Sequence, residues 1–398
     1  MAVKILWVGT KAPWPPVDGG RLLVVYTLEA LAAAGHEITL VVPSDATGSD
    51  REAVEKELRQ WCRPHLVPSR PVPFAIAAAR AMLRGLPTSV VRHTLPAVRE
   101  EVARCLRAEA FDVVHAEQLQ ALAQCEPAFE AGLRVVWRAQ NVESDLWRAT
   151  AEARTWAGPF LRREARLLAE CEAAAVRRTA ATVALTARDA ERLRALSGMP
   201  DRVHHVAAPF PAELPAADRP LPGAPALVLF GSGGWWPNAH GARWFLREAW
   251  PRVRRSLPEA QLHVFGTSGR PADAISYHPS PADSREAFAP GSILVVPLFV
   301  ASGVRMKILE AWARGVPVVA TPEAAAGMGE EDRHSVLISN DVAEFEKAIV
   351  ELACSSELRA SRVGHGRQRL RAAHQAPTVA SLLDASYRGQ VRPVTRGS

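Results

Sequence analysis

The sequence predicts an α/β protein with two doubly wound domains, each built on a mainly parallel sheet. Short apolar runs rich in Val, Leu and Ile alternate with longer helical patterns from the first residue onward. A proline-rich stretch interrupts this alternation near the middle of the chain. The length of 398 residues is large for one hydrophobic core and fits two domains of about 200 residues each. We therefore expect a first domain over residues 1–208, a linker over 209–225 and a second domain over 226–375.

The first half of the chain contains five expected strands and the helices between them. The expected buried strands cover residues 3–8, 37–42, 112–115, 134–137 and 181–185. The expected helices cover residues 21–34, 96–108 and 160–178. Thr186 followed by Asp189 resembles a capping box and predicts the start of another helix.

The alternation resumes after the proline-rich stretch. Six prolines at 209, 211, 215, 220, 222 and 225 exclude a helix or a central strand there. Further strands are expected over residues 227–230, 261–265, 293–296 and 316–320, with helices over 239–255 and 305–314. Ligands of such domains bind at the carboxyl ends of the strands, so the candidate residues are those that follow strands.

Composition and charge exclude several classes of protein. Hydrophobic residues make up 48% and charged residues 23% of the chain, which is typical of a globular protein rather than a disordered or collagen-like one. The net charge of +6 is too small for a dedicated nucleic-acid binder, but it allows a local basic pocket for an anionic ligand. Five scattered cysteines favour neither a disulfide framework nor a zinc site, and they fit a reducing cytoplasm. We expect no membrane-spanning segment.

Two glycine clusters follow expected strands. Gly19 and Gly20 precede a helix whose free N–H groups favour an anion, although an ordinary turn has the same composition. Neither a G-x-G-x-x-G nor a G-x-x-x-x-G-K-[ST] motif is present, which argues against a nicotinamide enzyme and a P-loop NTPase. In the second cluster, Gly233 and Gly234 are candidate ligand contacts, and Asn238 is expected to cap the following helix.

The segment 295–319 is the most informative part of the sequence. A buried strand leads into a Ser-Gly turn, and a helix then begins with Arg305 and Lys307 in its first turn. Cations are unfavourable at a helix N-terminus unless an anion binds there, so the pair predicts a diphosphate site. Glu310 is expected either to accept from sugar hydroxyls or to form an ion pair with Lys307.

Polar side chains follow two strands of the first domain. His115 and Glu117 end one strand, and Gln140, Asn141 and Glu143 follow the next. If both groups share one edge of the sheet, they are candidate contacts to an acceptor or sugar; the alternative is packing and capping. The histidines and carboxylates lack metal-ligand spacing, so no metal site is expected.

The chain resembles GT-B glycosyltransferases of family 4 over essentially its whole length, and four segments carry the resemblance. They are Pro-Pro-Val-Asp-Gly-Gly-Arg ending at 21, Arg-Ala-Gln-Asn-Val-Glu ending at 143, Trp-Pro-Asn ending at 238, and residues 301–319. The resemblance implies two Rossmann-like domains facing a central cleft and a nucleotide-diphosphate sugar donor, with a UDP-sugar expected. It also implies transfer with retention at the anomeric carbon, without a metal or other cofactor.

The resemblance also implies roles for individual residues. Glu310 would hold the nucleotide ribose, Gly19 and Gly20 would lie near the donor phosphates, and Arg305 and Lys307 would neutralise the leaving diphosphate. His115 would lie near the reacting sugar as a catalytic residue. A last helix within 376–398 would pack back on the first domain.

Two departures from the family pattern bear on activity. Ser302 stands where many members have a glutamate, so backbone N–H groups of Ser302, Gly303 and Val304 would meet the donor instead. Gln140 stands where relatives often have a histidine, and an amide cannot act as an acid or base.

Alternative functions therefore remain. The chain would be a transferase in the biosynthesis of a glycan or glycosylated natural product, a catalytically silent nucleotide-sugar-binding protein, or a GT-B-type epimerase. The acceptor would be a saccharide, a lipid-linked saccharide or a small molecule, and no nucleic acid is expected. Residues 73–92 mix apolar side chains with arginines, which predicts either a helix covering the first domain or a peripheral contact with the inner face of the membrane.

Overall fold

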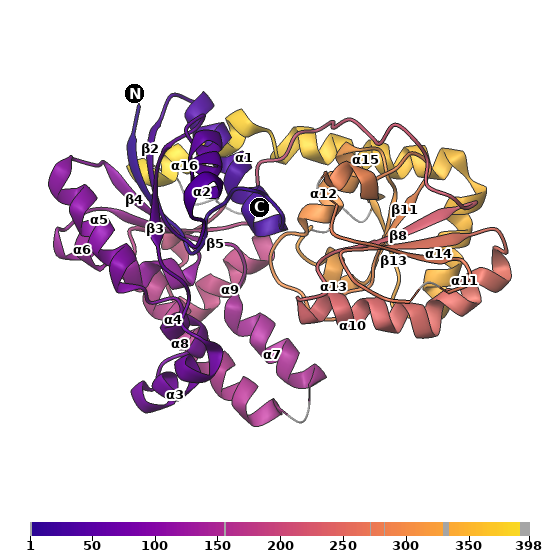
Figure 1. The fold of residues 1–398 in the computed structure, drawn as a ribbon, viewed down its shortest axis with the longest axis horizontal. Coiled ribbons are helices and arrows are strands. Elements are labelled where there is room, and N and C mark those ends of the chain that lie inside the picture. The colour runs from indigo at the N-terminus through magenta and orange to yellow at the C-terminus, as the bar shows by residue number, and fades with distance from the viewer. Residues whose placement is uncertain (1, 155–156, 271, 282, 329–333, 391–398) are drawn as a thin grey trace, which may run out of the picture. The chain divides into compact units, whose positions relative to one another are not determined.

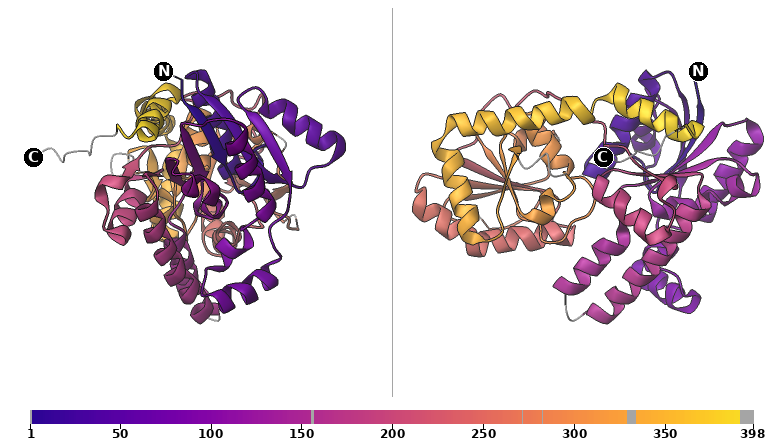
Figure 2. Two further views of the ribbon diagram at one scale, coloured as in Figure 1. Left: turned by 90° about the vertical axis from the view of Figure 1, so that its left-hand side faces the viewer. Right: turned by 180° about the vertical axis from the view of Figure 1, so that it is seen from behind.

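The computed structural model describes residues 2–154, 157–270, 272–281, 283–328 and 334–390. It divides into two compact units. Unit 1 contains Met1–Pro209, Ser302–Val304 and Ala376–Ser398, and unit 2 contains Phe210–Ala301 and Arg305–Gln375. Each unit has its own parallel sheet with helices on both faces (Figures 1 and 2).

The sheet of unit 1 has seven strands in the order β3-β2-β1-β4-β5-β6-β7. The strands are β1 (Lys4–Val8), β2 (Glu37–Ser44), β3 (Arg63–Pro68), β4 (Val113–Glu117), β5 (Val135–Ala139), β6 (Ala181–Ala184) and β7 (Val203–His205). Every neighbouring pair is parallel. The carboxyl ends of β1, β4 and β5 therefore lie side by side at one edge, which is where a ligand site is expected.

Unit 1 surrounds this sheet with helices. They are α1 (Gly19–Ala33), α2 (Gly48–Leu58), α3 (Phe74–Arg84), α4 (Thr88–Arg92), α5 (Pro96–Ala108), α6 (Glu126–Glu130), α7 (Glu143–Ala153), α8 (Gly158–Arg178), α9 (Ala187–Ser197) and α16 (Ala376–Arg388). The predicted cap at Thr186 is present, because its side chain accepts from Asp189 N at the start of α9. Asp18 caps α1 in the same way by accepting from Arg21 N.

The core of unit 1 lies on both faces of the sheet because strand side chains alternate. On β1, Ile5 and Trp7 pack in one hydrophobic cluster, whereas Leu6 and Val8 pack in another on the opposite face. The first cluster also receives Leu383 and Tyr387 from α16. The C-terminal helix is thus part of the unit 1 core.

Unit 2 has a six-stranded parallel sheet in the order β10-β9-β8-β11-β12-β13. The strands are β8 (Ala226–Phe230), β9 (Gln261–Phe265), β10 (Ile275–His278), β11 (Ile293–Val296), β12 (Val318–Ala320) and β13 (Val336–Ile338). The main helices are α10 (Trp236–Trp244), α11 (Trp250–Ser256), α12 (Met306–Ala313), α13 (Pro322–Ala325), α14 (Val342–Cys354) and α15 (Ser356–Ala373). The helix predicted over 239–255 begins earlier and contains a π-helical turn, η4 (Phe245–Ala249), just before Pro251, which has no N–H to donate.

The proline-rich stretch is hydrogen-bonded to unit 2 where it begins. Phe210 N donates to His374 O at 2.8 Å, and Leu214 N donates to Ala313 O at 3.1 Å. The boundary between the units falls after Pro209 in this part of the chain. None of the helices in the described residues is both long and apolar enough to span a bilayer.

Candidate active site

Lys307 is a partly buried cation of unit 2 whose ammonium group points into the protein. It lies in the first turn of α12, and its Nζ donates to Phe230 O at the end of β8 and to Asn238 Oδ1 at 3.1 Å. Burial, together with the nearby positive charge of Arg305, lowers the pKa of Lys307 to about 7. A lysine with this pKa gains its full charge when an anion binds beside it.

The pocket around Lys307 is formed by the carboxyl ends of β8, β9 and β11. Besides Lys307, its lining includes Gly231, Asn238, Thr267 and Pro297. Gly231 has φ +155°, and a Cβ there would lie 2.6 Å from Asn238 Nδ2 and 2.8 Å from Lys307 Nζ. Only glycine fits this position beside the lysine.

Asn238 does not have the predicted capping role. It lies inside α10, whose N-cap is Trp235, and its Nδ2 donates to Ser232 O at 3.1 Å while its Oδ1 accepts from Lys307. The amide therefore positions the lysine. In the same loop, Gly233 N donates to Gly266 O and Gly234 N to Ser232 Oγ, so both predicted glycines lie close to this pocket.

Arg305 is the N-cap residue of α12 rather than part of its first turn. Its guanidinium carbon lies 5.8 Å from the centre of the Trp235 ring, a cation–π distance. The structure thus brings Arg305 and Lys307 together at one helix start, as the spacing predicted.

Glu310 lies one turn further along α12 and is 4% exposed. Its Oε1 accepts from the Ser284 hydroxyl and from Arg314 Nε, the latter at 2.9 Å. Burial raises the pKa of Glu310 despite these hydrogen bonds. The expected alternatives were a contact to sugar hydroxyls or an ion pair with Lys307, and the ion pair that Glu310 forms is with Arg314.

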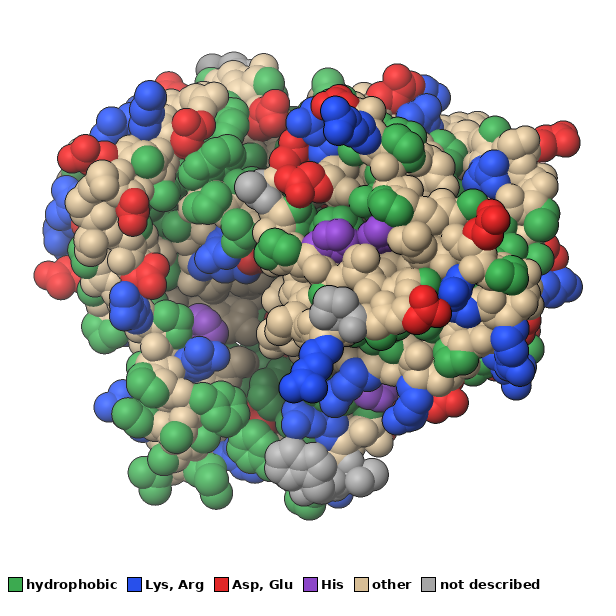
Figure 3. Space-filling view, turned by 45° about the vertical axis from the view of Figure 1, so that its right-hand side comes forward, with side chains coloured by type: hydrophobic (Ala, Val, Ile, Leu, Met, Phe, Trp, Pro, Cys, Tyr) green, Lys and Arg blue, Asp and Glu red, His purple; other side chains and the backbone are tan. Residues whose placement is uncertain are grey.

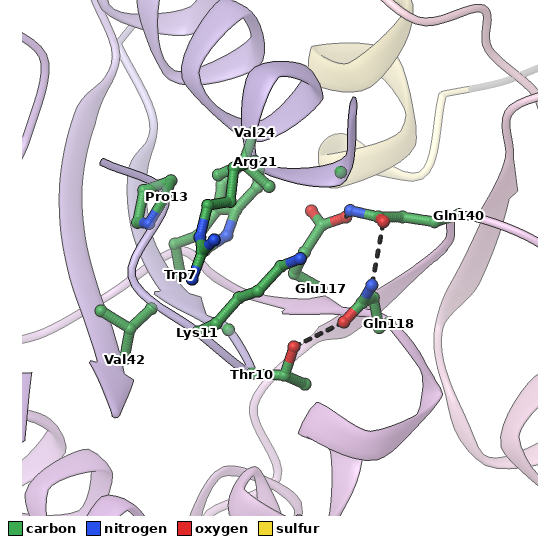
Figure 4. Close-up of a pocket in the computed structure, with 12 residues that line it drawn as sticks. Trp7, Thr10, Lys11, Pro13, Arg21, Val24, Val42, Glu117, Gln118 and Gln140 are labelled. Atoms are coloured by element: carbon green, nitrogen blue, oxygen red, sulfur yellow. Dashed lines mark hydrogen bonds between the residues drawn. The ribbon is translucent and has the colours of Figure 1, made fainter. Parts of the chain in front are cut away.

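Unit 1 has its own polar pocket at the carboxyl ends of β1 and β4 (Figure 4). Its lining is contributed by Trp7, Gly9, Thr10, Lys11, Pro13, Gly20, Arg21, Val24, Val42, Glu117, Gln118 and Gln140. Lys11 Nζ bonds to both Asp18 carboxylate oxygens at 2.9 Å, and Arg21 NH1 lies 3.2 Å from Asp18 Oδ2. Burial tends to raise the pKa of Asp18, but these two cations outweigh it and lower the pKa.

A chain of amide hydrogen bonds crosses this pocket. The Thr10 hydroxyl donates to Gln118 Oε1, Gln118 Nε2 donates to Gln140 Oε1 at 2.9 Å, and Gln140 Nε2 donates to Glu117 Oε1 at 2.8 Å (Figure 4). Gln140 thus both donates and accepts, which an amide does at any pH. A Cβ on Gly20 would lie 3.0 Å from Gln140 Oε1, so the start of α1, at Gly19, approaches this chain closely.

His115 is not placed to contact a substrate, contrary to the sequence expectation. It has no exposed surface, stacks on Trp7 at 3.7 Å between ring centres, and uses both ring nitrogens. Nε2 lies 3.1 Å from Glu117 Oε2, and Nδ1 lies 2.9 Å from the Tyr387 hydroxyl. The sequence shows that His115 ends a strand, but it does not show whether the side chain points toward the ligand-binding edge of the sheet or into the core. It therefore did not distinguish a substrate contact from a packed residue.

Asn141 and Glu143 lie at the start of α7. Asn141 Nδ2 donates to Glu143 Oε1 at 3.1 Å, and burial raises the pKa of Glu143. The Ser302–Val304 turn, which belongs to unit 1, lies against this region, because Ser302 Oγ accepts from Val142 N at 3.0 Å. Gly303 has φ +75°, and a Cβ there would lie 2.3 Å from Gln140 O.

Sequence reasoning missed several residues of these pockets. Lys11 and Asp18 flank the first glycine loop, and their positions after a strand and before a helix were a usable signal. Ser284 and the hydrogen bond between Asn238 and Lys307 had no signal, because the partners are 26 and 69 residues apart.

One cluster among the described residues has potential metal ligands. His65, Glu101 and Cys105 have ligand atoms within 4.8 Å of one another. Arg104 hydrogen-bonds to Glu101 and to His65, and its hydrogen bond to Glu101 is the main cause of the lowered pKa of that carboxyl. The Arg104 guanidinium therefore occupies the position beside the Glu101 carboxylate where a metal ion would bind.

Comparison with known proteins agrees with this fold. Residues 17–214 match the family model described as Glycosyltransferase Family 4, and residues 224–355 match the one described as Glycosyl transferases group 1. A comparison with curated proteins finds no match.

Solved structures share the fold at low sequence identity. Sucrose-phosphate synthase from Thermosynechococcus elongatus has a TM-score of 0.68 at 15% identity, covering 98% of this chain and 99% of that one. Anabaena HepE in complex with UDP-glucose has a TM-score of 0.66 at 12% identity, covering 97% of this chain and 100% of that one. WaaG, a glycosyltransferase involved in lipopolysaccharide biosynthesis, has a TM-score of 0.62 at 13% identity, with coverage of 97% and 100%.

The two Rossmann-like parallel α/β units and the matches to solved glycosyltransferases define the GT-B fold. The chain belongs to the GT-B glycosyltransferases of family 4, and it is an enzyme of that class.

Proposed function

We propose that the enzyme transfers a sugar from a UDP-sugar to a hydroxyl acceptor with retention of anomeric configuration and without a metal. The observation that carries the donor assignment is the buried ammonium of Lys307 at the start of α12. Solved relatives of the same fold bind UDP and UDP-glucose, which supports a uridine nucleotide. The proposed acceptor is a saccharide, a lipid-linked saccharide or a small molecule.

Three charged residues of the segment 305–310, at the start of α12, have a part in this proposal. When the bond between the anomeric carbon and the diphosphate breaks, the leaving oxygen takes the electron pair and gains negative charge. Lys307, Arg305 and the free N–H groups at the start of α12 would stabilise that charge. The Glu310 carboxylate, oriented by Ser284 and Arg314, would accept from the ribose hydroxyls.

The number of protons taken up when UDP binds tests the proposed donor site. Because the pKa of Lys307 is about 7, most molecules carry a neutral amine at pH 8, and a bound diphosphate would raise that pKa. We expect uptake of close to one proton per UDP bound at pH 8, measured by calorimetry in buffers of different ionisation enthalpy. Lys307→Met should abolish the uptake and weaken UDP binding by about tenfold or more.

Lys347 provides the matched control, because it lies in the same unit and its side chain is 77% exposed. Lys347→Met should keep both the affinity and the proton uptake, and Arg305→Ala should weaken binding. UDP binding by Lys307→Met with wild-type affinity and wild-type uptake would show that the diphosphate binds elsewhere.

Products distinguish the proposed transfer from its alternatives. Incubation with a panel of nucleotide sugars and acceptors, followed by mass spectrometry and NMR of the anomeric proton, should give a glycoside with the donor's configuration. A new nucleotide sugar formed without acceptor would indicate an epimerase. Binding with no turnover would indicate a silent binding protein.

We also propose that the enzyme works in the cytoplasm, at the inner face of the membrane. Scattered free cysteines support a reducing compartment. The proposed membrane contact is made by exposed side chains of α3.

A further inference from the structure

Helix α3 packs with its small residues inward and its large apolar residues outward. It buries Ala77 and Ala81 against Val91, with Val72 packed alongside. By contrast, Leu83 is 89% exposed, Met82 65% and Ile76 48%. Phe74, at the start of the helix, is 50% exposed and lies edge-on to the Phe160 ring, with 6.4 Å between the ring centres. Burial of large apolar side chains is normally a main source of stability, so this arrangement leaves a face with no partner within the described chain.

The exposed face of α3 is continuous and uncharged. Ala75, Ile76, Ala79, Met82 and Leu83 are all exposed and follow the three- and four-residue spacing of one helix face. We call these five residues the outward face of α3. Figure 3 shows hydrophobic side chains gathered at the lower left of the molecule, where α3 lies in Figure 1.

Exposed arginines flank this face. Arg80 and Arg84 lie on the helix between the outward face and the buried alanines, and neither forms an ion pair with the part of the chain that the structure describes. Long arginine side chains in such positions keep their charge at a polar boundary while their stems cover apolar surface.

The surrounding sequence is free of negative charge. Residues 58–99 contain no Asp or Glu, although the whole chain has 42 in 398 residues. The same stretch contains arginines at 59, 63, 70, 80, 84, 92 and 99. Arg59, Arg63 and Arg70 form ion pairs with acids outside this stretch. Arg80 and Arg84 form none with the described residues, so the charge on α3 itself is complementary to an anionic surface.

The helix is held firmly on unit 1. The buried carboxylate of Glu164 accepts from Thr88 N, at the start of α4, at 2.6 Å, and Arg163 donates to Ala81 O of α3. Arg92 donates to Val72 O on the other side, and Gly85 ends the helix in the left-handed conformation. The apolar face is thus a fixed feature of the fold.

We propose that unit 1 docks on a membrane of anionic phospholipid, with the outward face of α3 inserted among the headgroups and Arg80 and Arg84 at the phosphates. An apolar helix face bordered by basic residues is the arrangement by which helices lie in a bilayer interface. An anionic lipid explains both the apolar face and the absence of acids. This contact does not depend on the proposed sugar transfer, so binding and activity are tested separately.

Vesicle sedimentation tests the proposal on the full-length protein. Wild type should bind vesicles of phosphatidylcholine with 30% phosphatidylglycerol, lose binding at high salt, and bind pure phosphatidylcholine vesicles weakly. Met82→Ser/Leu83→Ser should reduce partitioning by roughly tenfold to hundredfold because two large apolar groups no longer insert. Arg80→Glu/Arg84→Glu should reduce it roughly thirtyfold or more.

Two matched controls keep the outcome specific. Leu382→Ser changes an apolar residue that is 41% exposed on α16, and Arg252→Glu/Arg255→Glu makes the same charge change on exposed positions of α11. Both should bind as wild type does, with circular dichroism confirming the fold of every variant. Wild type remaining in the supernatant with anionic vesicles would overturn the proposal. So would equal losses in the controls, or a lipid-free dimer that Met82→Ser/Leu83→Ser converts to monomer, since a second copy would then cover α3.

Discussion

At the scale of single residues, the environment of His115 determines its chemistry. Glu117 is held ionised by Arg138, whose Nε donates to it at 2.8 Å, so the carboxylate can only accept from His115 Nε2. Nδ1 is then the acceptor for the Tyr387 hydroxyl. Burial is the main reason that the pKa of His115 falls to about 4, and the imidazole is neutral at physiological pH.

This neutral histidine predicts a contribution to the pH dependence of stability. Its pKa is about 4 in the folded state and near 6.5 when unfolded, so below pH 6.5 the unfolded state binds more protons. The stability is fully present above pH 6.5 and is lost as the pH falls toward 4, by about 3 kcal/mol in total. Denaturant unfolding between pH 7 and 4 should show a shallower loss for His115→Gln than for wild type.

The comparison of slopes separates His115 from the carboxylates that do not contact it. Glu117 does contact it, and Arg138 still lowers the pKa of Glu117 in the His115→Gln variant. His334→Gln, at an exposed position, should keep the wild-type slope. Parallel pH profiles for wild type and His115→Gln would mean that His115 does not titrate on unfolding.

The sequence indicated which local segments carry the charged and polar residues of the candidate sites, but it did not indicate what those side chains contact. It located Arg305 and Lys307 at one helix start, because a strand, a turn and a helix pattern are local features. It could not show that His115 is enclosed, because Trp7 and Tyr387 lie 108 and 272 positions away. Contacts between distant segments leave no periodic signal in the chain.

At the scale of elements, α15 packs closely on α12, the helix that carries the proposed donor-site residues. A Cβ on Gly366 of α15 would lie 2.3 Å from Cγ of the fully buried Trp312 on α12. Arg367 also donates to the carbonyl oxygens of Trp312 and Ala313 at 3.2 Å, which satisfies the end of α12. The close approach of the two helices requires glycine at 366.

Two glycines of the same helix provide a matched prediction. Gly366→Ala should lower the free energy of unfolding by roughly 1–3 kcal/mol because the added methyl group overpacks the Trp312 contact. Gly364→Ala, where a Cβ meets nothing within 4 Å, should raise it by about 0.4–1 kcal/mol through helix propensity. Thermal or denaturant unfolding measures both, and equal effects would show that the Trp312 contact is not tight.

The elements that the sequence predicted are those buried on both faces. Strands β1, β2, β4 and β5 are almost wholly buried, are rich in Val, Ile and Leu, and were located within two residues. The edge strands β3, β7, β10 and β13 were not predicted, because they are only partly buried. In addition, β3 contains two prolines, and β7 and β13 have three residues each. Residues 73–92 were recognised as amphipathic, but only the structure shows that α3 turns its large side chains outward.

At the scale of the whole molecule, unit 1 is completed by the C-terminal end of the chain. Helix α16 adds Val379, Ala380, Leu383 and Tyr387 to the core that contains Trp7 and Leu28. Arg134 also donates to Ser386 O at 3.2 Å. The first 209 residues therefore lack part of the core on which their own sheet rests.

Removal of α16 should destabilise unit 1 more than unit 2. Truncation after Gln375 exposes the α1 face of the sheet and costs on the order of 5 kcal/mol, comparable with the whole stability of a domain. Hydrogen exchange monitored by mass spectrometry should show faster exchange in β1 and β4 of the truncated chain, with β8 and β11 of unit 2 as internal reference.

Two neighbouring leucines of α16 test the same packing with single substitutions. Leu383→Ala, at a residue 1% exposed, should lower the free energy of unfolding by about 2–5 kcal/mol, whereas Leu382→Ala, at its 41% exposed neighbour, should change it by less than about 0.5 kcal/mol. Unchanged exchange in β1 and β4 after truncation would mean that unit 1 folds without its C-terminal helix, and the burial of Tyr387 on His115 would then be a consequence of the fold rather than a support for it.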